Sequence, residues 1–336
     1  MTIVDIAKEA GYSVSTVSRV LNGRRDVSPE AKEKIMAIVD AHQFVPNKNA
    51  KHLKQTVSKS ILILVKGISN MLFANVIEAL QMILEASDYS LRVHYLDEDA
   101  NEVREAIQMC REHRPMGILF LGGYAQNFLE AFDAVSVPCV LVTDRGDELG
   151  FDNLSSVSTD DVAAAEKAVD YLFAHGHRHI GVIGGDMGMS SPSLRRKKGI
   201  LKSFAKNGEA FDERYYATAR FSYDSSYRAM QQLLSQNLPI TAVFAMSDVM
   251  AIGAMRAIFD AGLRVPEDIS VIGFDGTLLA DYYNPKIVTI RQQYEKIAQR
   301  SLEILLSMID LHKQAVHELI PFALKNTESV IQRKEN

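Results

Sequence analysis

The sequence predicts an all-α helix-turn-helix head followed by an α/β body, in which two lobes are each built on a doubly wound parallel sheet. Three observations predict this fold class. The 336 residues exceed what one ordinary hydrophobic core accommodates. The first 45 residues show helical periodicity. From residue 60, short apolar runs alternate with amphipathic stretches. We therefore divide the chain into a head (1–45), a hinge (46–59) and a body (60–336).

Three short helices are expected in the head. Each begins at a residue whose hydroxyl can cap a helix, namely Thr2, Ser13 and Ser28. Pro29 suits the first position of the third helix. Gly11 and Asn22-Gly23 end the first two. Behind the caps, side chains recur at helical spacing: Ile3, Ile6, Ala7 and Ala10; Val14, Val17 and Leu21; Ile35, Ile38, Val39 and His42. Two short helices joined through a glycine turn form a helix-turn-helix, and the third closes a small core.

The charge distribution separates the head from the rest of the chain. Residues 1–60 carry ten Lys and Arg against six Asp and Glu, which gives +4; the remaining 27 basic and 36 acidic residues give −9. A basic head on an acidic body indicates that only the head contacts a polyanion.

The outer face of the second helix suits DNA. It carries Val14, Ser15, Thr16, Ser18 and Arg19. Short hydroxyl side chains allow close approach to bases and phosphates, valine can contact a thymine methyl, and arginine can bind a guanine edge. The alternative is a three-helix packing module with a polar surface.

The segments "VDIAKEAGYSVSTVSRVLNG", "VS" and "FVPNKNAKHL" resemble, in order and spacing, the head of the lactose-repressor (LacI/GalR) family of bacterial transcription regulators. Tyr12 departs from the small aliphatic residue usual there, without affecting the expected fold. The resemblance implies that Val14 and Ser15 read operator bases. The DNA-binding residues assigned on this basis are Thr2, Ser13, Val14, Ser15, Thr16, Ser18, Arg19, Asn22, Asn47, Ala50 and Leu53.

The hinge is polar and basic, and residues 49–54 have a helical pattern with Ala50 and Leu53 on one side. So short a helix is marginal in water. The resemblance implies that it orders in the minor groove beside its twin from a second subunit, with Ala50 permitting close approach and Leu53 wedging open a base step. A plain linker is the alternative.

In the body, strands are expected at 61–65, 91–96, 117–122, 139–143, 180–185, 242–246 and 269–275, and helices at 74–86, 102–113, 160–175, 194–207, 223–236 and 248–261. Such alternation gives parallel sheets, and two sheets that face one another form a cleft at the carboxyl ends of their strands. The body resembles the periplasmic-binding-protein-like effector domain of the same family. The expected lobes are about 60–159 with 290–319, and about 160–289 with 320–332.

Residues just after the strands are the candidates for binding a small molecule. Carboxylates can accept the protons of sugar hydroxyls, an arginine can bridge neighbouring hydroxyls, and an aromatic ring can cover the C–H face of a sugar. The candidates are Asn70, Phe73, Asp144, Arg196, Phe221, Ser247, Asp275, Gln292 and Tyr294. The resemblance independently marks Arg196 and Asp275 as the principal effector contacts.

Some neighbouring residues have a structural interpretation instead. Asp248 is expected to cap the helix after it, and Arg145 to pair with Asp147 or Glu148. Within the basic run 195–198 only Arg196 is assigned to the cleft. Ser247 and the segment "SNMLF" depart from the pattern usual in the family, which leaves the identity of the ligand open.

Other classes of protein are disfavoured. No apolar run approaches the roughly 20 residues needed to span a bilayer, and no signal peptide is expected. We expect a cytoplasmic protein, associated with the nucleoid when bound to operator, with reduced Cys110 and Cys139. The histidines of "HGHRH" at 175–179 lack acidic or cysteine companions, and no GxGxxG or catalytic grouping stands out. Neither enzymatic activity nor a metal or cofactor is expected.

The expected function is that of a sequence-specific DNA-binding regulator, and specifically a repressor of carbohydrate-utilisation genes. A homodimer would read two half-sites of a near-palindromic operator, and a sugar-like effector in the cleft would alter its affinity for DNA. Two alternatives remain open: a global regulator co-controlled by a phosphorylated carrier protein, and a regulator that responds to a purine or nucleoside.

The variant Leu53→Ala should weaken binding to operator while sparing most binding to random DNA, because a wedge acts only on bent DNA. Anisotropy titrations with the two DNAs measure the two dissociation constants. An equal loss on both DNAs would contradict the wedge.

Overall fold

The computed structural model describes residues 2–21, 27–42, 44, 59–67, 69–85 and 87–333. Contacts within the chain fall into two units, Met1–Ser58 and Lys59–Asn336. Four of the residues assigned to DNA lie outside the described residues, namely Asn22, Asn47, Ala50 and Leu53. Their roles stay predictions.

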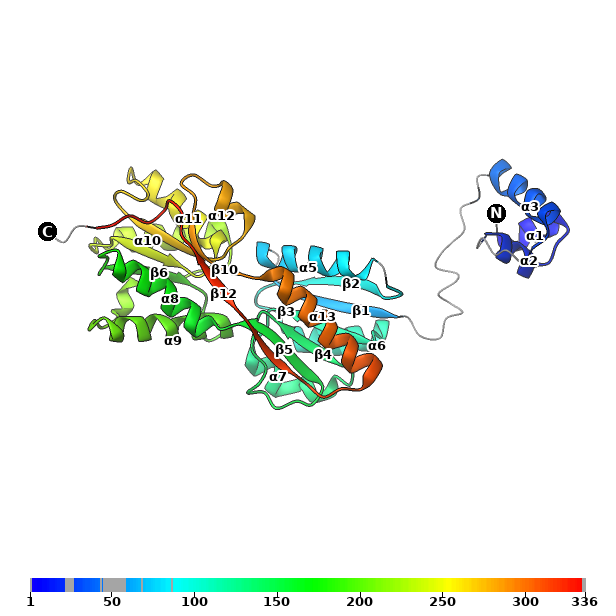
Figure 1. Cartoon of the computed structure of the whole chain (residues 1–336), viewed down its shortest axis with the longest axis horizontal. Helices are drawn as coiled ribbons and strands as arrows, with labels where there is room; N and C mark the ends of the chain where they lie inside the picture. The colour runs from blue at the N-terminus through cyan, green and yellow to red at the C-terminus, as the bar shows by residue number, and fades with distance from the viewer. Residues whose placement is uncertain are drawn as a thin grey trace. The chain divides into compact units, whose positions relative to one another are not determined.

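The head consists of the helices α1 (Ile3–Ala10), α2 (Val14–Leu21) and α3 (Pro29–Ala41) (Figure 1). The predicted caps are all present. The Thr2 hydroxyl accepts the N–H of Asp5, whose carboxylate accepts the N–H of Thr2. Ser13 accepts the N–H of Thr16 at 3.1 Å, and Ser28 caps α3. These caps satisfy backbone donors that helix termini otherwise leave unpaired.

A small apolar core holds the three helices together. It contains Ile6, Ala7, Ala10, Val17, Val20, Ile35 and Val39. Val20 takes the buried position in α2, whereas Val14 is 42% exposed. His42, expected on the packed face of α3, is also exposed and contacts Glu9 at 3.3 Å. Val17 and Val20, three residues apart, lie on the face of α2 that packs inward, while Val14 in the first turn stays exposed.

The first lobe of the body is a six-stranded parallel sheet, in the order β11-β5-β4-β3-β1-β2. Its strands are β1 (Ser60–Lys66), β2 (Ser90–Leu96), β3 (Gly117–Leu121), β4 (Cys139–Val142), β5 (Leu154–Thr159) and β11 (His317–Ile320). Its helices are α5 (Met71–Leu84), α6 (Glu102–His113), α7 (Ala125–Ala131) and α13 (Tyr294–Leu311), with a 3₁₀ turn at Phe132–Ala134.

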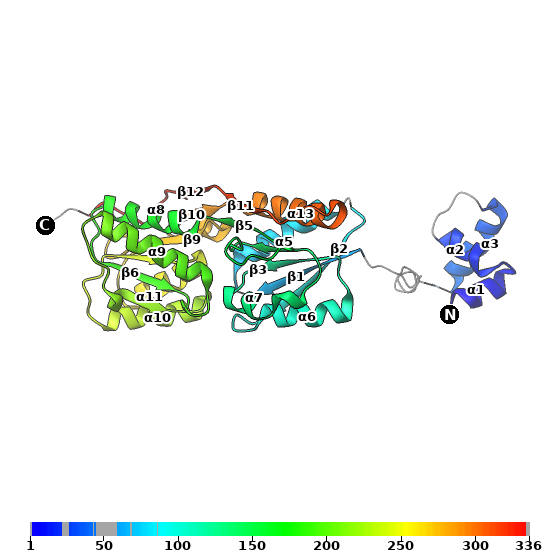
Figure 2. The same ribbon diagram turned by 90° about the horizontal axis from the view of Figure 1, so that it is seen from below.

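Helices cover both faces of this sheet (Figures 1 and 2). Successive side chains of a strand point to opposite faces. Accordingly Ile61 and Ile63 of β1 pack with α5 and α13, while Leu62 and Leu64 pack with α6 and α7. Burial on both faces explains why β1 reads as a continuous apolar run.

The second lobe is a six-stranded sheet in the order β12-β10-β9-β8-β6-β7, parallel except for the antiparallel pairing of β12 with β10. Its strands are β6 (Ile180–Gly184), β7 (Tyr216–Thr218), β8 (Ala242–Ala245), β9 (Ser270–Asp275), β10 (Val288–Gln292) and β12 (Phe322–Lys325). Its helices are α8 (Asp161–Ala174), α9 (Ser191–Lys206), α10 (Tyr223–Ser235), α11 (Asp248–Asp260) and α12 (Leu278–Tyr282), with a 3₁₀ turn at Glu213–Tyr215.

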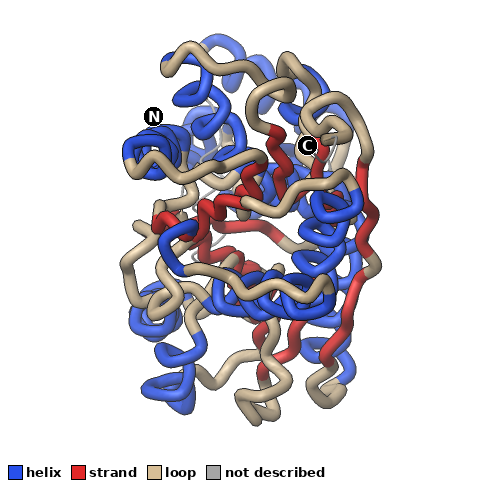
Figure 3. The backbone as a smooth tube through the Cα atoms, turned by 90° about the vertical axis from the view of Figure 1, so that its left-hand side faces the viewer, coloured by secondary structure: helices blue, strands red, loops and turns tan. Residues whose placement is uncertain are grey.

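Again the strands lie between helices (Figure 3), with α8 and α9 on one face and α10 and α11 on the other (Figure 2). Each helix pair crosses at a glycine. A Cβ atom at Gly199 would lie 2.2 Å from the Val162 carbonyl oxygen, and one at Gly253 would lie 2.3 Å from the Tyr223 carbonyl oxygen. Only glycine permits backbones to approach this closely. The fold class predicted from the sequence is confirmed in both units.

Three connections join the lobes within the described body. The chain leaves the first sheet after β5, returns between β10 and α13, and crosses again between β11 and β12. The return follows Gln292, slightly later than the expected boundary at 290. The strands β5, β11, β10 and β12 lie at one edge of the two sheets, so β2 and β7 form the edges farthest from the connections. Among the described residues, none of the helices combines the length with the apolar character that a membrane span requires.

Candidate effector cavity and DNA-binding face

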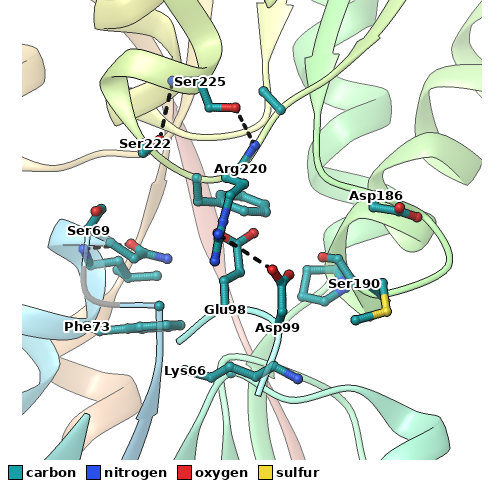
Figure 4. A pocket seen from close by; sticks show the side chains of 18 of the residues that line it. Lys66, Ser69, Phe73, Glu98, Asp99, Asp186, Ser190, Arg220, Ser222 and Ser225 are labelled. Atoms are coloured by element: carbon teal, nitrogen blue, oxygen red, sulfur yellow. Dashed lines mark hydrogen bonds and ion pairs between the residues drawn. The ribbon is translucent and has the colours of Figure 1, made fainter. Parts of the chain in front are cut away.

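A cavity of about 770 Å³ lies where the strands of both sheets end (Figure 4). Its size falls within the range of about 300–1,000 Å³ that small-molecule sites occupy. Six of the nine residues predicted to bind an effector line it: Asn70, Phe73, Arg196, Phe221, Asp275 and Gln292. The site therefore lies at the carboxyl ends of the strands, as expected for sheets of this kind.

Arg196 is the most constrained cation of the cavity. It lies in the second turn of α9, the helix that Ser190 caps. Its side chain is only 6% exposed. Its Nε donates to the Asp161 carboxylate at 2.8 Å, and a terminal nitrogen donates to the Met246 carbonyl. The guanidinium lies 3.7 Å from the ring centroid of Phe274. A charge so deeply buried is stable only with such partners, and they hold it in one orientation.

Asp275 ends β9 beside this arginine and accepts a hydrogen bond from the Gln292 amide at 2.9 Å. Burial raises the pKa of Asp275 to about 8; Arg196 opposes the rise, and nearby Asp248 and Asp161 add to it. The carboxyl group is therefore largely protonated at neutral pH, and it can donate as well as accept a hydrogen bond with a ligand hydroxyl.

The backbone is strained where a strand of each lobe ends. Asp275 has φ of 112°, and Thr143, which follows β4 and also lines the cavity, has φ of 68°. Non-glycine residues in this region of φ are uncommon and cluster at functional sites. Such strain is consistent with a ligand site at the ends of these strands.

Two aromatic rings contribute from opposite lobes. Phe73 belongs to α5 of the first lobe, and its ring lies against Gly122; a Cβ atom there would be 3.1 Å away. Phe221 precedes α10 of the second lobe, and its ring lies against Gly185, where a Cβ atom would be 2.9 Å away. Glycines at two strand ends thus leave room for two rings that can cover apolar faces of a ligand.

Three predicted effector residues do not line the cavity. Asp144 is 1% exposed and forms an ion pair with Arg195, so it links the first lobe to the second. Ser247 accepts the N–H of Met250 at 3.1 Å and caps α11. Tyr294 packs against the apolar core of the first lobe.

The expectation that Asp248 caps α11 is wrong, because Ser247 performs that role. Asp248 is fully buried, where it accepts hydrogen bonds from the N–H and hydroxyl of Thr277 and from the hydroxyl of Thr289. Burial raises the pKa of Asp248 to about 6. Its carboxylate joins α11 to β10 and to the turn after β9. The expected pairing of Arg145 with Asp147 is present, at 2.9 Å from Nε.

The sequence prediction missed a charged cluster at the cavity. Arg220, just after β7, reaches Asp97, Glu98 and Asp99, just after β2, at 2.6, 3.4 and 3.5 Å; Figure 4 shows it extending toward Glu98 and Asp99. Asp97, Glu98 and Asp99 form an acidic triad. The triad follows a predicted strand and was therefore detectable by the strand-end rule. Arg220 was not, because β7 has only three residues and no strand was predicted there.

The triad and Arg220 connect the lobes at the side remote from the chain connections. β2 and β7 are the edge strands of their sheets, so this ion-pair cluster joins the lobes where no chain segment does. Lys66 and Asp186, which also follow predicted strands, line the same cavity.

The first turn of α2 forms the candidate DNA-binding face. Val14, Ser15 and Arg19 are exposed. The Ser13 hydroxyl contacts those of Ser15 and Thr16 at 2.7 and 2.8 Å. These hydroxyls sit at the N-terminus of a helix, where backbone N–H groups and the helix dipole favour a phosphate. Thr16 and Ser18 are half-buried beside them.

The histidines at 175–179 do not form a metal site in the described body. His177 is engaged by the Thr241 hydroxyl at 3.0 Å and by the Ile331 carbonyl at 3.2 Å. Burial lowers the pKa of His177 to about 4. Among the residues with described positions, no three His, Cys, Asp or Glu side chains are grouped to hold a metal ion.

Comparison with known proteins places this geometry in a family. Residues 2–47 match "Bacterial regulatory proteins, lacI family", and residues 169–330 match "Periplasmic binding protein-like domain". The "HTH-type transcriptional regulator MalR" of Clostridium butyricum is 35% identical over 98% of this chain and 99% of its own. The chain belongs to the lacI family. It is therefore a transcriptional regulator with a DNA-binding head, and its relatives are regulators rather than enzymes.

Solved structures of lacI-family proteins share the architecture. A lac repressor dimer bound to operator and an anti-inducer has a TM-score of 0.79 and 25% identity, over 98% of this chain and 99% of that one. A complex of the transcriptional regulator CelR with cellobiose has a TM-score of 0.72 and 25% identity over the same shares. Both matches cover 98% of this chain.

The variant Asp275→Asn should become more stable relative to wild type as pH rises from about 4 to 8. The unfolded chain releases this proton near pH 3.8, whereas the folded protein holds it to about pH 8, so deprotonation destabilises the wild type across that interval. We expect a relative gain of about 1 kcal/mol or more, measured by urea unfolding at several pH values.

Asp268→Asn is the matched control for this pH series. Arg264 lowers the pKa of Asp268 to about 2, so the carboxylate of Asp268 contributes stability above the pKa of the unfolded chain and this variant has no such gain. Parallel pH profiles for Asp275→Asn and wild type would contradict the buried, protonated carboxyl.

Proposed function

We propose that this lacI-family protein is a repressor of carbohydrate-utilisation genes, and that a small sugar in the cavity controls its affinity for operator DNA. One observation carries the proposal. Arg196, Asp275 and Gln292 converge with the rings of Phe73 and Phe221 on a single cavity from both lobes. A sugar presents hydroxyl edges to such polar groups and C–H faces to such rings. The similarity to a CelR–cellobiose complex supports this choice of ligand.

The proposed coupling runs through the two lobes. Because the effector contacts residues of both, binding favours one arrangement of the lobes over others. The hinge leads directly into β1, the strand whose end carries Lys66 of the cavity. A change in the conformation of the first lobe is therefore transmitted to the hinge through the single strand β1.

We propose that the protein binds DNA as a homodimer on a near-palindromic operator, with one head for each half-site. The structure of the lac repressor dimer on operator supports this arrangement. Val14 and Ser15 would contact base edges, while Ser13, Thr16, Ser18 and Arg19 would contact phosphates or hold the helix in register. A protein that acts on operator DNA is expected in the cytoplasm.

The purine alternative also fits the relatives of this chain, which include the HTH-type transcriptional repressor PurR of Pasteurella multocida, 31% identical over 95% of this chain. The contacts of the described residues favour a sugar over both alternatives. A purine could stack between the rings, but its edge would compete with Asp275 for the Gln292 amide. A phosphorylated carrier protein needs exposed cations. Arg300 of α13 is already bound by Glu318 at 2.8 Å and by Glu303, which argues against docking there.

The variant Arg196→Ala should retain operator binding and lose the response to effector, because the head contains none of the cavity residues. The operator is obtained by selection from random DNA, and the effector by a thermal-shift screen of sugars, nucleosides and purines. Electrophoretic mobility shifts with and without the effector then measure the response.

Arg214→Ala is the control, since it removes an exposed arginine that pairs with Asp212 and does not line the cavity. Because loss of Arg196 leaves Asp161 unpaired, Phe221→Ala provides a second cavity variant that removes no charge. If both cavity variants release operator at the effector concentration at which wild type releases it, the assignment of the cavity is wrong.

A further inference from the structure

Every cation that lines the cavity already has a carboxylate partner, within the part of the chain that the structure describes. The pairs are Lys66–Glu102 at 2.7 Å, Arg196–Asp161 at 2.8 Å, Arg220–Asp97 at 2.6 Å and Arg228–Asp224 at 2.6 Å. An anionic ligand would find no unpaired cation among them. It would have to displace a carboxylate, which would leave that carboxylate without its partner.

Two aspartates that line the cavity make no ion pair among the described residues. Asp186 accepts the N–H of Gly188 at 2.7 Å, and Asp275 accepts the Gln292 amide at 2.9 Å. A carboxyl group has room for further hydrogen bonds beyond one donor. These two groups are therefore suited to ligand hydroxyls, and Asp186 in particular repels a ligand of negative charge.

The acidic triad strengthens this discrimination. Arg220 and Arg228 are the cations that an entering anion would meet, because 48% and 66% of their side chains are exposed, whereas Lys66 and Arg196 are each 6% exposed. Arg228 pairs with Asp224 alone among the described residues, and the one held by several carboxylates is Arg220. Three carboxylates of the triad lie within 3.5 Å of its guanidinium. The cluster of Arg220 and the triad thus holds more acidic side chains than cations, and the local electric field disfavours anions.

We propose that the effector is an uncharged, hydroxyl-rich molecule, and that the acidic triad excludes anionic counterparts such as uronates and sugar phosphates by occupying Arg220. This inference rests on the proposed function, in which a sugar binds this cavity. It assigns to the acidic triad a role in selecting the ligand by its charge. A site achieves such selectivity by opposing the wrong ligand as well as by contacting the right one.

Matched ligand pairs test the charge preference on the full wild-type chain. Isothermal titration compares glucose with glucuronate and glucose 6-phosphate, ribose with ribose 5-phosphate, and cellobiose with cellobionate. We expect any uncharged sugar that binds to do so at least about tenfold more tightly than its anionic counterpart. An anionic sugar that binds more tightly than its uncharged counterpart overturns the inference and leaves the proposed sugar regulator standing.

Removal of the triad tests the role of Arg220 directly, whichever sugar proves to be the effector. The triple variant Asp97→Asn, Glu98→Gln, Asp99→Asn releases Arg220, so its dissociation constant for glucose 6-phosphate should fall about tenfold or more from that of wild type. Circular dichroism checks folding. If the triple variant does not fold, Asp97→Asn alone removes the 2.6 Å pair and serves the same purpose.

The matched control is Asp268→Asn, which removes a carboxylate from the ion pair with Arg264 and does not alter the cavity. A triad variant that binds glucose 6-phosphate no better than wild type and this control overturns the proposed role of the triad. The proposed function fails by a different result, namely that no sugar of either charge changes the affinity of wild type for its selected operator.

Discussion

The pairing of buried charge at the ends of the strands is the constraint on which the cavity depends. Arg196 is held by Asp161, by the carbonyl of Met246 and by the ring of Phe274. These partners come from the start of α8, the end of β8 and the body of β9. A guanidinium buried without these partners would be destabilising, so the same contacts that hold Arg196 within the second lobe also orient the group that is proposed to meet the ligand. The site is thereby organised before any ligand arrives.

The fold was predictable where one physical signal dominated. Every predicted strand is present, and apart from the edge strand β2 each is an apolar run buried on both faces of a sheet. The strands missed were β5, β7, β10, β11 and β12. "LSSVST" of β5 is buried but rich in hydroxyls, and β7 has three residues. Hydrophobicity along the chain does not reveal a buried strand rich in hydroxyls, nor an edge strand of three or four residues such as β7, β11 or β12.

The site was predictable to the same degree and for a related reason. Phe73 and Asp275, which follow recognisable strands or caps, were predicted and line the cavity, and the predicted outer residues Val14 and Ser15 of α2 are exposed. Arg220 was missed with β7, whereas the triad was missed although it directly follows the predicted strand at 91–96. The misassignment of Ser247 and Asp248 has another cause. Two adjacent side chains can each cap a helix, and only the positions of Thr277 and Thr289 in three dimensions decide which carboxylate is drawn into the core.

In the proposed function, ligand in the cavity and operator on the head compete through the conformation of one protein. The decisive measurement is the dissociation constant of the identified effector, determined once with free protein and once with protein saturated by operator. Competition requires a weaker constant on DNA, by a factor of about 5–150, equal to the factor by which effector weakens operator binding. An effector that binds with the same constant in both titrations rules competition out.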